Sequence, residues 1–270
     1  MRGTGYPRRI VCLTEETTET LYLLGEQARI VGISGFTVRP RQARKEKPRV
    51  SAFTSAKLDK ILALEPDLVL GFSDLQADIA RDLVHAGLDV HIFNHRSVDG
   101  IFSMIRTVGA LVGAQDRTEM LLTELDTGLA EISECAARLP RRPRVYFEEW
   151  DEPMISAIGW VSELIAIAGG IDCFPELARQ AHGQGRIIAD ADEVVRRAPD
   201  IILGSWCGKR FRPEKVAARP GWADVPAVRT GHVFEIKSAE ILQPGPAALT
   251  DGVRRIHEIV TAWAEERVAT

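Results

Sequence analysis

The sequence predicts an α/β protein with two lobes, each built on a parallel sheet, joined by a single long helix, with a ligand cleft between the lobes. Apolar runs of strand length alternate with helical patterns in both halves of the chain, and this order is typical of parallel sheets. A helix followed by Pro-Asp and a strand occurs at Pro66 and again at Pro199, 133 residues later. We expect the lobes at residues 1–115 and 140–270, and the connecting helix at 116–139.

The first lobe is predicted from apolar runs bounded by turn residues and from apolar residues at helical spacing. Leu58 and Ile61 lie on one face of a helix that Pro66 ends, because proline cannot continue a helix. The basic segment up to Lys47 is predicted as a surface loop. We expect strands at 9–13, 30–34, 68–71 and 90–93, and helices at 17–24, 58–64, 79–86 and 98–112.

The second lobe repeats this alternation after a long helical pattern at 116–138. At about 1.5 Å per residue, that helix is roughly 35 Å long, which is enough to cross from one lobe to the other. An irregular stretch rich in Trp, Lys and Arg is expected at 205–213. We expect strands at 144–147, 201–204 and 233–236, and helices at 161–168, 190–198 and 248–265.

Composition places the chain among ordinary globular proteins. Hydrophobic residues make up 45% and charged residues 27% of 270 residues, which argues against disorder and against a coiled coil. With a formal charge of −4, the chain lacks the excess of positive charge typical of nucleic-acid-binding proteins, so no nucleic-acid partner is expected. The four cysteines are far apart and have no metal-finger spacing.

No apolar run reaches the ~18–20 residues that span a bilayer, so the chain is not expected to cross a membrane. The N-terminus moves into the first strand without the apolar stretch of a signal peptide. As written, the sequence therefore predicts a cytoplasmic protein. The alternative is a periplasmic protein from which an export segment was removed.

Two consecutive glutamates follow an apolar strand in each half of the chain. Glu15 and Glu16 follow the first strand, and Glu148 and Glu149 follow the strand that opens the second half, where Trp150 comes next. Since ligands of open parallel sheets bind outside the carboxyl ends of the strands, both pairs are expected to face the cleft.

The candidate ligand-binding residues are those that directly follow predicted strands at the cleft. Aromatic, carboxylate and cationic side chains occur together, which suits a ligand with apolar faces and several hydrogen-bonding arms. The candidates are Glu15, Glu16, Thr17, Phe36, Arg39, Phe53, Ser73, Asp74, His95, Glu148, Glu149, Trp150, Trp206, Lys209 and Arg210.

Each of these candidates has a structural alternative. A glutamate at a strand end is often solvated or paired with a nearby Lys or Arg. Trp150 and Trp206 fill core space in the alternative interpretation, and His95 is an ordinary loop residue. Carboxylates converging from both lobes also suit a hard cation such as Ca²⁺ or Mg²⁺, although no loop has the acidic periodicity of a dedicated site.

Catalytic signatures are scarce in this sequence. It contains no G-x-G-x-x-G, G-x-x-x-x-G-K-[ST], G-x-S-x-G or H-E-x-x-H motif. A catalytic pair drawn from the four glutamates has no nucleophile or electrophile to accompany it. We therefore expect a protein that is not an enzyme and has no intrinsic cofactor.

From Arg9 to Trp263 the chain resembles the substrate-binding proteins of cobalamin and iron-siderophore ABC uptake systems, and most closely the cobalamin-binding branch. This resemblance implies two α/β lobes joined by one long helix, with the ligand held between them and little hinge motion. The stretches that carry it are Arg9–Thr20, Val31–Ser34, Lys57–Val69, Glu163–Gly170 and the Pro-Asp unit that ends in Gly204.

The resemblance also implies docking to a membrane permease through an acidic residue seven positions before each Pro-Asp. Asp59 and Asp192 hold those positions here, and each is shorter than the glutamate usual in the family. The chain differs further in lacking a signal peptide or lipoprotein cysteine, and its Glu-Glu-Trp stretch is more acidic than a typical corrinoid pocket. Trp206-Cys207-Gly208 has tryptophan where corrinoid binders have proline.

Two functions follow as hypotheses. The first is a non-catalytic, monomeric binding protein that holds cobalamin or another large metal chelate and docks to an ABC permease. The second is a cytoplasmic enzyme, or a protein that handles metals or metal chelates, on the same two-lobe scaffold. Titration with cobalamin tests the first hypothesis, and metal analysis of the purified protein tests the second.

Overall fold

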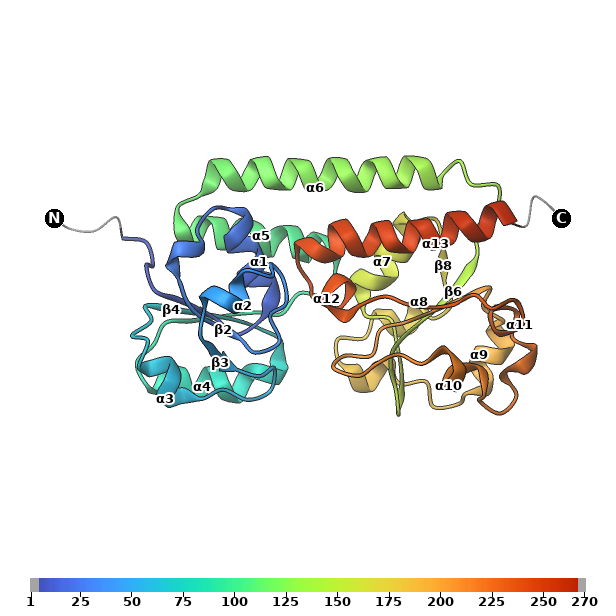
Figure 1. The fold of residues 1–270 in the computed structure, drawn as a ribbon, viewed down its shortest axis with the longest axis horizontal. Coiled ribbons are helices and arrows are strands. Elements are labelled where there is room, and N and C mark those ends of the chain that lie inside the picture. The colour runs from blue at the N-terminus through green and yellow to red at the C-terminus, as the bar shows by residue number, and fades with distance from the viewer. Residues whose placement is uncertain (1–4, 267–270) are drawn as a thin grey trace. The chain divides into compact units, whose positions relative to one another are not determined.

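A computed structural model describes residues 5–266, and the chain divides into two compact units. Unit 1 comprises Met1–His95 and Asp99–Glu124, and unit 2 comprises Arg96–Val98 and Leu125–Thr270. The division falls inside α6 (Gln115–Ala136), which Figure 1 shows as one uninterrupted helix. Each unit is described by itself below.

Unit 1 is built on a five-stranded sheet with the order β3-β2-β1-β4-β5, in which every pairing is parallel. Apolar residues of strand and helix pack on one another, with Val11, Val69 and Ile61 fully buried in one cluster. The strands are β1 (Ile10–Cys12), β2 (Ile30–Ser34), β3 (Arg49–Ser51), β4 (Leu68–Phe72) and β5 (Val90–Phe93).

The helices of unit 1 agree with the sequence pattern, with two differences. The first helix begins at Glu15 rather than Thr17, so the glutamate pair lies in its first turn. The basic segment predicted as a loop contains a short helix. The helices are α1 (Glu15–Leu23), η1 (Gln27–Arg29), α2 (Ala43–Glu46), α3 (Leu58–Leu62), η2 (Asp74–Gln76), α4 (Ala77–His85) and α5 (Val98–Val112).

Unit 2 has a sheet of order β10-β9-β6-β7, with β8 also paired to β6. Its pairings are parallel except for the antiparallel pair β6·β7. The strands are β6 (Arg144–Asp151), β7 (Met154–Ser156), β8 (Ile171–Asp172), β9 (Ile201–Gly204) and β10 (Val233–Glu235). Two α/β units with parallel sheets were predicted and are confirmed, and the β6–β7 hairpin is an addition.

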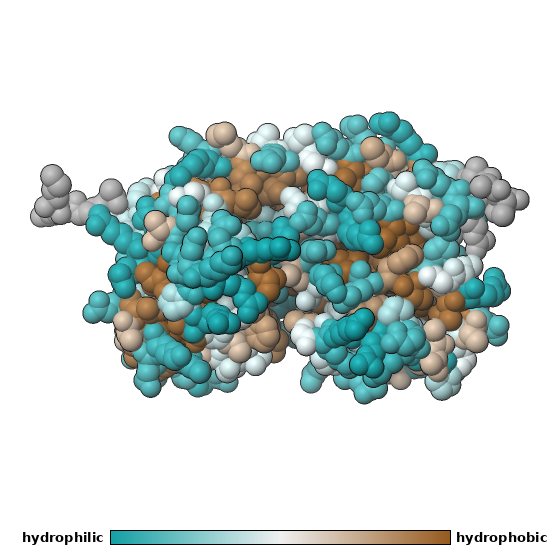
Figure 2. Space-filling model, viewed as in Figure 1, coloured by the Kyte–Doolittle hydropathy of each residue, from teal (hydrophilic) through white to brown (hydrophobic). Residues whose placement is uncertain are grey.

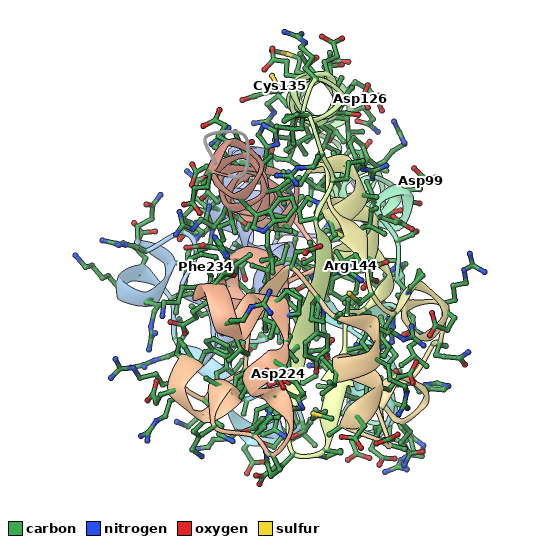
Figure 3. The ribbon with its side chains drawn as sticks, turned by 90° about the vertical axis from the view of Figure 1, so that its right-hand side faces the viewer. Asp99, Asp126, Cys135, Arg144, Asp224 and Phe234 are labelled. Atoms are coloured by element: carbon green, nitrogen blue, oxygen red, sulfur yellow. The ribbon has the colours of Figure 1, made fainter. Side chains whose placement is uncertain are left out.

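The prediction that β6 stops before its carboxylates is wrong. The strand continues through Glu148, Glu149 and Trp150 to Asp151, because β7 returns along it and supplies a partner for that part of the backbone. Figure 3 labels Arg144, where β6 begins. The acidic stretch is therefore part of the sheet rather than a loop beyond it.

The helices of unit 2 surround a core that contains the fully buried Tyr146, Phe174 and Trp222. The closing helix, predicted as one element, opens with a π-helical turn. The elements are α7 (Gly159–Ile167), α8 (Pro175–Ala178), η3 (Gly183–Arg186), α9 (Asp192–Arg197), α10 (Pro213–Ala217), η4 (Trp222–Asp224), α11 (Pro226–Thr230), α12 (Ser238–Ile241), η5 (Ala248–Gly252) and α13 (Val253–Glu266).

The repeated Pro-Asp has the same structural role in both units. The Asp67 carboxylate accepts the backbone N–H groups of Arg8 and Arg9 at 2.7 and 2.8 Å. The Asp200 carboxylate accepts the backbone N–H of Arg144 at 2.9 Å. Each aspartate thus holds the start of the first strand of its sheet, which explains why the residue recurs.

The residue before each repeated proline has the same unusual backbone. Glu65 and Ala198 both have φ of 45°, in the left-handed region that residues with a Cβ rarely adopt. A helical backbone is disfavoured directly before proline. α9 ends at Arg197, next to Ala198, and α3 ends at Leu62, three residues before Glu65. The repeat seen in the sequence is therefore matched in the backbone of both units.

Candidate functional site

The carboxyl edge of the unit 1 sheet exposes apolar side chains. Phe36 follows β2 and is 54% exposed, Leu75 follows β4 and is 61% exposed, and Phe53 follows β3 and is half-buried. Exposed apolar groups gathered at one edge of a parallel sheet are typical of a ligand-binding surface. Sequence reasoning named Phe36 and Phe53 and missed Leu75, whose position in the turn after Asp74 was the available signal.

Glu15 fastens the loop that carries Phe36. Its Oε1 accepts the backbone N–H groups of Val38 and Arg39 at 3.0 and 2.7 Å. The Arg39 guanidinium in turn pairs with Glu19 at 3.0 Å. Burial raises the pKa of Glu15 to about 7, although the two backbone hydrogen bonds oppose that rise. Glu15 therefore holds the loop that carries Phe36 in place by accepting hydrogen bonds from its backbone.

Glu16 and Thr17 lie fully inside unit 1. The Thr14 hydroxyl donates to Glu16 Oε1, while Oε2 is buried and has no hydrogen-bond partner among the described residues. Burial raises the pKa of Glu16 to about 7. The Thr17 hydroxyl donates to the Thr14 carbonyl at 3.3 Å. The structure thus gives neither residue a surface for ligand contact.

Ser73, Asp74 and His95 lie at the ends of β4 and β5. Ser73 is buried, and its Oγ donates to Asp74 Oδ1 at 3.1 Å and accepts the backbone N–H of Leu75 at 3.2 Å. Asp74 itself is exposed. The half-buried His95 ring lies edge-on to Phe72, with ring centroids 5.2 Å apart. Asp74 and His95 reach the surface at this edge, whereas Ser73 shapes the turn.

In unit 2, Glu148 is completely buried and has a full set of partners. Arg219 donates to its two oxygens at 2.5 and 2.9 Å, the Tyr146 hydroxyl donates at 2.8 Å, and the Trp206 indole N–H donates at 3.0 Å. Trp206 is only 3% exposed and belongs to the core. Glu148 and Trp206 are therefore structural side chains in the interior of unit 2. This agrees with the alternatives given for them from the sequence, which were pairing with an arginine and packing in the core.

The next two carboxylates of β6 are also paired. Glu149 accepts from the buried Arg186 at 2.5 and 3.0 Å. Asp151 accepts from Lys209 Nζ at 2.6 and 2.7 Å. Sequence reasoning missed Arg186, Arg219 and Asp151, because their partners come from distant parts of the chain.

Trp150, Lys209 and Arg210 are candidate residues of unit 2 that reach the surface beside this network. The Trp150 indole is half-buried, and Lys209 Nζ lies 5.2 Å from its ring centroid and 5.0 Å from that of Trp206. Arg210 is exposed in the loop after β9 and has no ion pair with any residue from 5 to 266. The accessible edge of unit 2 thus combines one indole with cationic side chains.

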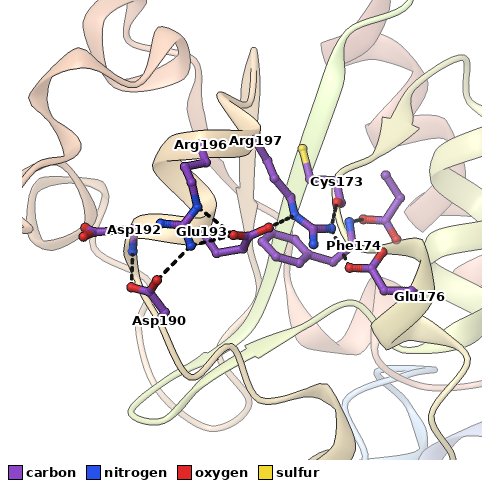
Figure 4. A network of polar contacts seen from close by, with 9 residues as sticks. Cys173, Phe174, Glu176, Asp190, Asp192, Glu193, Arg196 and Arg197 are labelled. Carbon is purple, nitrogen blue, oxygen red and sulfur yellow. Dashed lines mark hydrogen bonds and ion pairs between the residues drawn. The ribbon is translucent and has the colours of Figure 1, made fainter.

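Asp59 and Asp192 both lie in the first turn of a helix, α3 in unit 1 and α9 in unit 2, and both are exposed. Figure 4 shows that the charged neighbours of Asp192 form ion pairs with one another. Glu193 pairs with Arg196 and Arg197, and Asp190 pairs with Arg196. Neither the Asp59 nor the Asp192 carboxylate has an ion pair within the described part of the chain. Both carboxylates are available to a cationic partner.

Residues 5–266 hold no group of three or more His, Cys, Asp or Glu side chains placed to bind a metal ion. No helix in the same range is long and apolar enough to cross a membrane. Hydrophilic side chains cover much of the face shown in Figure 2, with apolar patches between them.

Comparison with known proteins identifies the family. The family profile described as "Periplasmic binding protein" matches residues 10–240, which include most of the chain. The chain belongs to the periplasmic binding protein family. The family consists of substrate-binding proteins, and the sequence resemblance to such proteins of ABC uptake systems is confirmed.

Two relatives of this chain are named as substrate-binding proteins. The ABC transporter substrate-binding lipoprotein YvrC of Bacillus subtilis is 25% identical over 94% of this chain and 80% of its own length. A vitamin B12-binding protein of Vibrio campbellii is 24% identical over 90% of this chain and 86% of its own length.

A solved structure agrees with the family assignment. The periplasmic heme-binding protein RhuT of Roseiflexus sp. RS-1 is 25% identical and has a TM-score of 0.79, covering 94% of this chain and 99% of its own. These findings overturn the expectation of a cytoplasmic protein. The relatives are described as lipoproteins or periplasmic proteins, which points to a location outside the cytoplasm.

Proposed function

We propose that this chain is a non-catalytic solute-binding protein of an ABC-type uptake system and binds a corrinoid or a similarly large metal chelate. The observation that carries the proposal is the family match over residues 10–240, with relatives named for vitamin B12 and heme. Exposed aromatic side chains at the carboxyl edges of the sheets support it, because large flat ligands bind to such surfaces.

The accessible candidates divide into two chemical groups. Phe36, Phe53 and Trp150 supply apolar surface for the ring of a chelate. Polar contacts come from the exposed members of the predicted set, and Arg210 is the clearest cation among them. The buried carboxylates support the site from beneath and are not needed as direct contacts.

Titration of the purified protein with cyanocobalamin and with hemin tests this function. Binding of at least one chelate is expected at micromolar concentration, measured by calorimetry or by quenching of tryptophan fluorescence. No signal from either chelate at tens of micromolar would overturn the ligand class.

Replacing Trp150 with alanine is expected to weaken chelate affinity by about tenfold, because stacking on an aromatic ring is lost. Met120→Ala is the matched control, since Met120 is 72% exposed on α6 and is not a candidate contact. Unchanged affinity of the Trp150 variant would remove this indole from the ligand site.

Docking to a permease is proposed for Asp59 and Asp192. Charge reversal at both positions, Asp59→Lys with Asp192→Lys, is expected to abolish ligand uptake in cells while ligand affinity in solution stays the same. Asp126→Lys is the control, since Asp126 is an exposed acid on α6, labelled in Figure 3. Normal uptake by the double variant would refute the docking role.

A further inference from the structure

Residues 41–49 of unit 1 carry five cationic side chains that have no ion pair with any residue from 5 to 266. The segment leads through α2 to the first residue of β3. Four of the five side chains are exposed, and Lys47 is half-buried. These side chains, together called the cationic patch, are Arg41, Arg44, Lys45, Lys47 and Arg49.

Ordered backbone holds the cationic patch at the surface of unit 1. Ala43 is fully buried and anchors α2, and its carbonyl accepts the backbone N–H of Lys47 at 2.9 Å. Arg49 opens β3, which is an edge strand of the sheet. Figure 3 shows α2 as a short light-blue helix that projects at the left of the picture. The five cations are therefore presented together and outward.

No acid of the segment compensates these charges. Glu46 is the one acid in it, and its Oε2 accepts from the Tyr22 hydroxyl at 2.7 Å. The segment thus has five positive charges and one negative charge, in a chain whose formal charge is −4. By contrast, the adjacent Arg196 and Arg197 both pair with Glu193. Because like charges repel, an anionic surface that approaches the cationic patch is attracted and also relieves this repulsion.

The composition of the segment distinguishes one anionic partner from another. Residues 41–49 include no aromatic residue, whereas proteins that bind single-stranded nucleic acid stack bases on aromatic rings. They include no large aliphatic residue either, whereas a protein interface has an apolar core. Contact through charge alone, by a cluster of about four to eight Lys or Arg residues, is typical of binding to anionic lipid head groups.

We propose that the cationic patch of unit 1 binds the anionic phospholipid surface of a membrane. A solute-binding protein of an uptake system works beside a membrane, and in this respect the inference rests on the proposed function. The contact is electrostatic and requires no apolar side chain to enter the bilayer. Residues 41–49 contain none of the candidate ligand-binding residues, so membrane contact and chelate binding are separable.

Cosedimentation of the full chain with lipid vesicles tests this inference. One set of vesicles contains phosphatidylcholine alone, and the other contains equal parts of phosphatidylcholine and phosphatidylglycerol. The test variant is Arg41→Gln with Arg44→Gln. The matched control is Arg179→Gln with Arg229→Gln, since these two arginines of unit 2 are exposed and have no ion pair within residues 5–266. Circular dichroism checks that both variants are folded.

The wild type is expected to bind the vesicles that contain phosphatidylglycerol and not those of phosphatidylcholine alone. Binding is expected to disappear as salt is raised from about 0.1 M to about 1 M, because the Debye length falls from about 10 Å to about 3 Å. The Arg41 and Arg44 variant is expected to bind at least about tenfold more weakly, since each cation near an anionic surface contributes about fivefold. The control variant is expected to bind like the wild type.

Each contrary result is distinct from failure of the proposed function. No binding to the phosphatidylglycerol vesicles at about 0.1 M salt overturns the inference, as does equal weakening in the two variants. Duplex DNA is the competing probe, measured by fluorescence anisotropy. If DNA binds more tightly than the vesicles and depends on Arg41 and Arg44, the cationic patch is a nucleic-acid surface and the lipid proposal is wrong. Titration with cyanocobalamin and hemin reports on the proposed function separately, and its failure leaves the vesicle result unchanged.

Discussion

Replacing Arg219 with methionine is expected to lower the free energy of unfolding by about 3–5 kcal/mol, since removing one partner leaves a buried charge uncompensated. Glu148 is fully buried, and both of its oxygens accept from this guanidinium. Urea unfolding followed by circular dichroism measures the change. Arg212→Met is the control, because Arg212 is exposed and has no ion pair in the described residues.

A second variant distinguishes the lost ion pair from lost packing. Adding Glu148→Gln to Arg219→Met is expected to restore a large part of the lost stability, because the glutamine carries no charge, its oxygen still accepts from the Trp206 indole N–H, and its amide N–H donates to the Tyr146 hydroxyl. If the double variant is as unstable as Arg219→Met alone, the loss comes from packing of the arginine stem, and the buried charge is not the cause.

Stability of unit 1 is expected to fall as pH rises from about 4.5 to about 7. Burial raises the pKa of Glu16 from 4.5 to about 7, so the folded state binds a proton that the unfolded state has released. The stabilising effect of that proton is complete below pH 4.5 and is lost by pH 7, and it amounts to about 3 kcal/mol for this carboxyl group.

Glu16→Gln is therefore expected to raise the free energy of unfolding at pH 8 and to reduce the slope between pH 4.5 and pH 7. The glutamine oxygen still accepts from Thr14, and its amide takes the place of the unpartnered Oε2. Urea unfolding of wild type and variant from pH 5 to pH 8 measures the difference. Glu134→Gln, at an exposed position on α6, is the control. Parallel curves for Glu16→Gln and wild type would contradict the raised pKa.

Much of the fold was predictable because it is determined by local sequence. Pro66 and Pro199 prevent the helices before them from continuing into the next strand, and the apolar runs beside them are short enough to be strands. The 133-residue repeat then indicated two similar sheets. The β6–β7 hairpin was not predictable in this way, because β6 has the apolar start of a buried parallel strand and its carboxylates have the composition of a loop.

The ends of predicted strands led to Phe36, Phe53 and Trp150, whose side chains are exposed or half-buried, although Trp150 lies within β6. The ion pairs of the carboxylates were not predictable in this way. The pairing of Glu148 with Arg219 joins residues 71 positions apart, and that of Asp151 with Lys209 joins residues 58 apart. Such pairs depend on tertiary packing and have no sequence signal. A stretch that seemed acidic is electrically neutral for this reason.

The location of the protein was the least predictable property. The expectation of a cytoplasmic protein came from the residues that precede Arg9, and these carry no information about what the folded units do. The family match instead depends on residues 10–240, and for that reason it overturned the expectation of a cytoplasmic protein.

The setting of Trp150 makes it a natural optical reporter. The other four tryptophans, Trp160, Trp206, Trp222 and Trp263, are each at most 5% exposed, whereas Trp150 is half-buried. A water-soluble collisional quencher such as acrylamide will therefore reach one fluorophore selectively. Emission from that fluorophore comes from the edge where the chelate is proposed to bind, so the unmodified protein needs no attached dye to serve as a sensor for its own ligand.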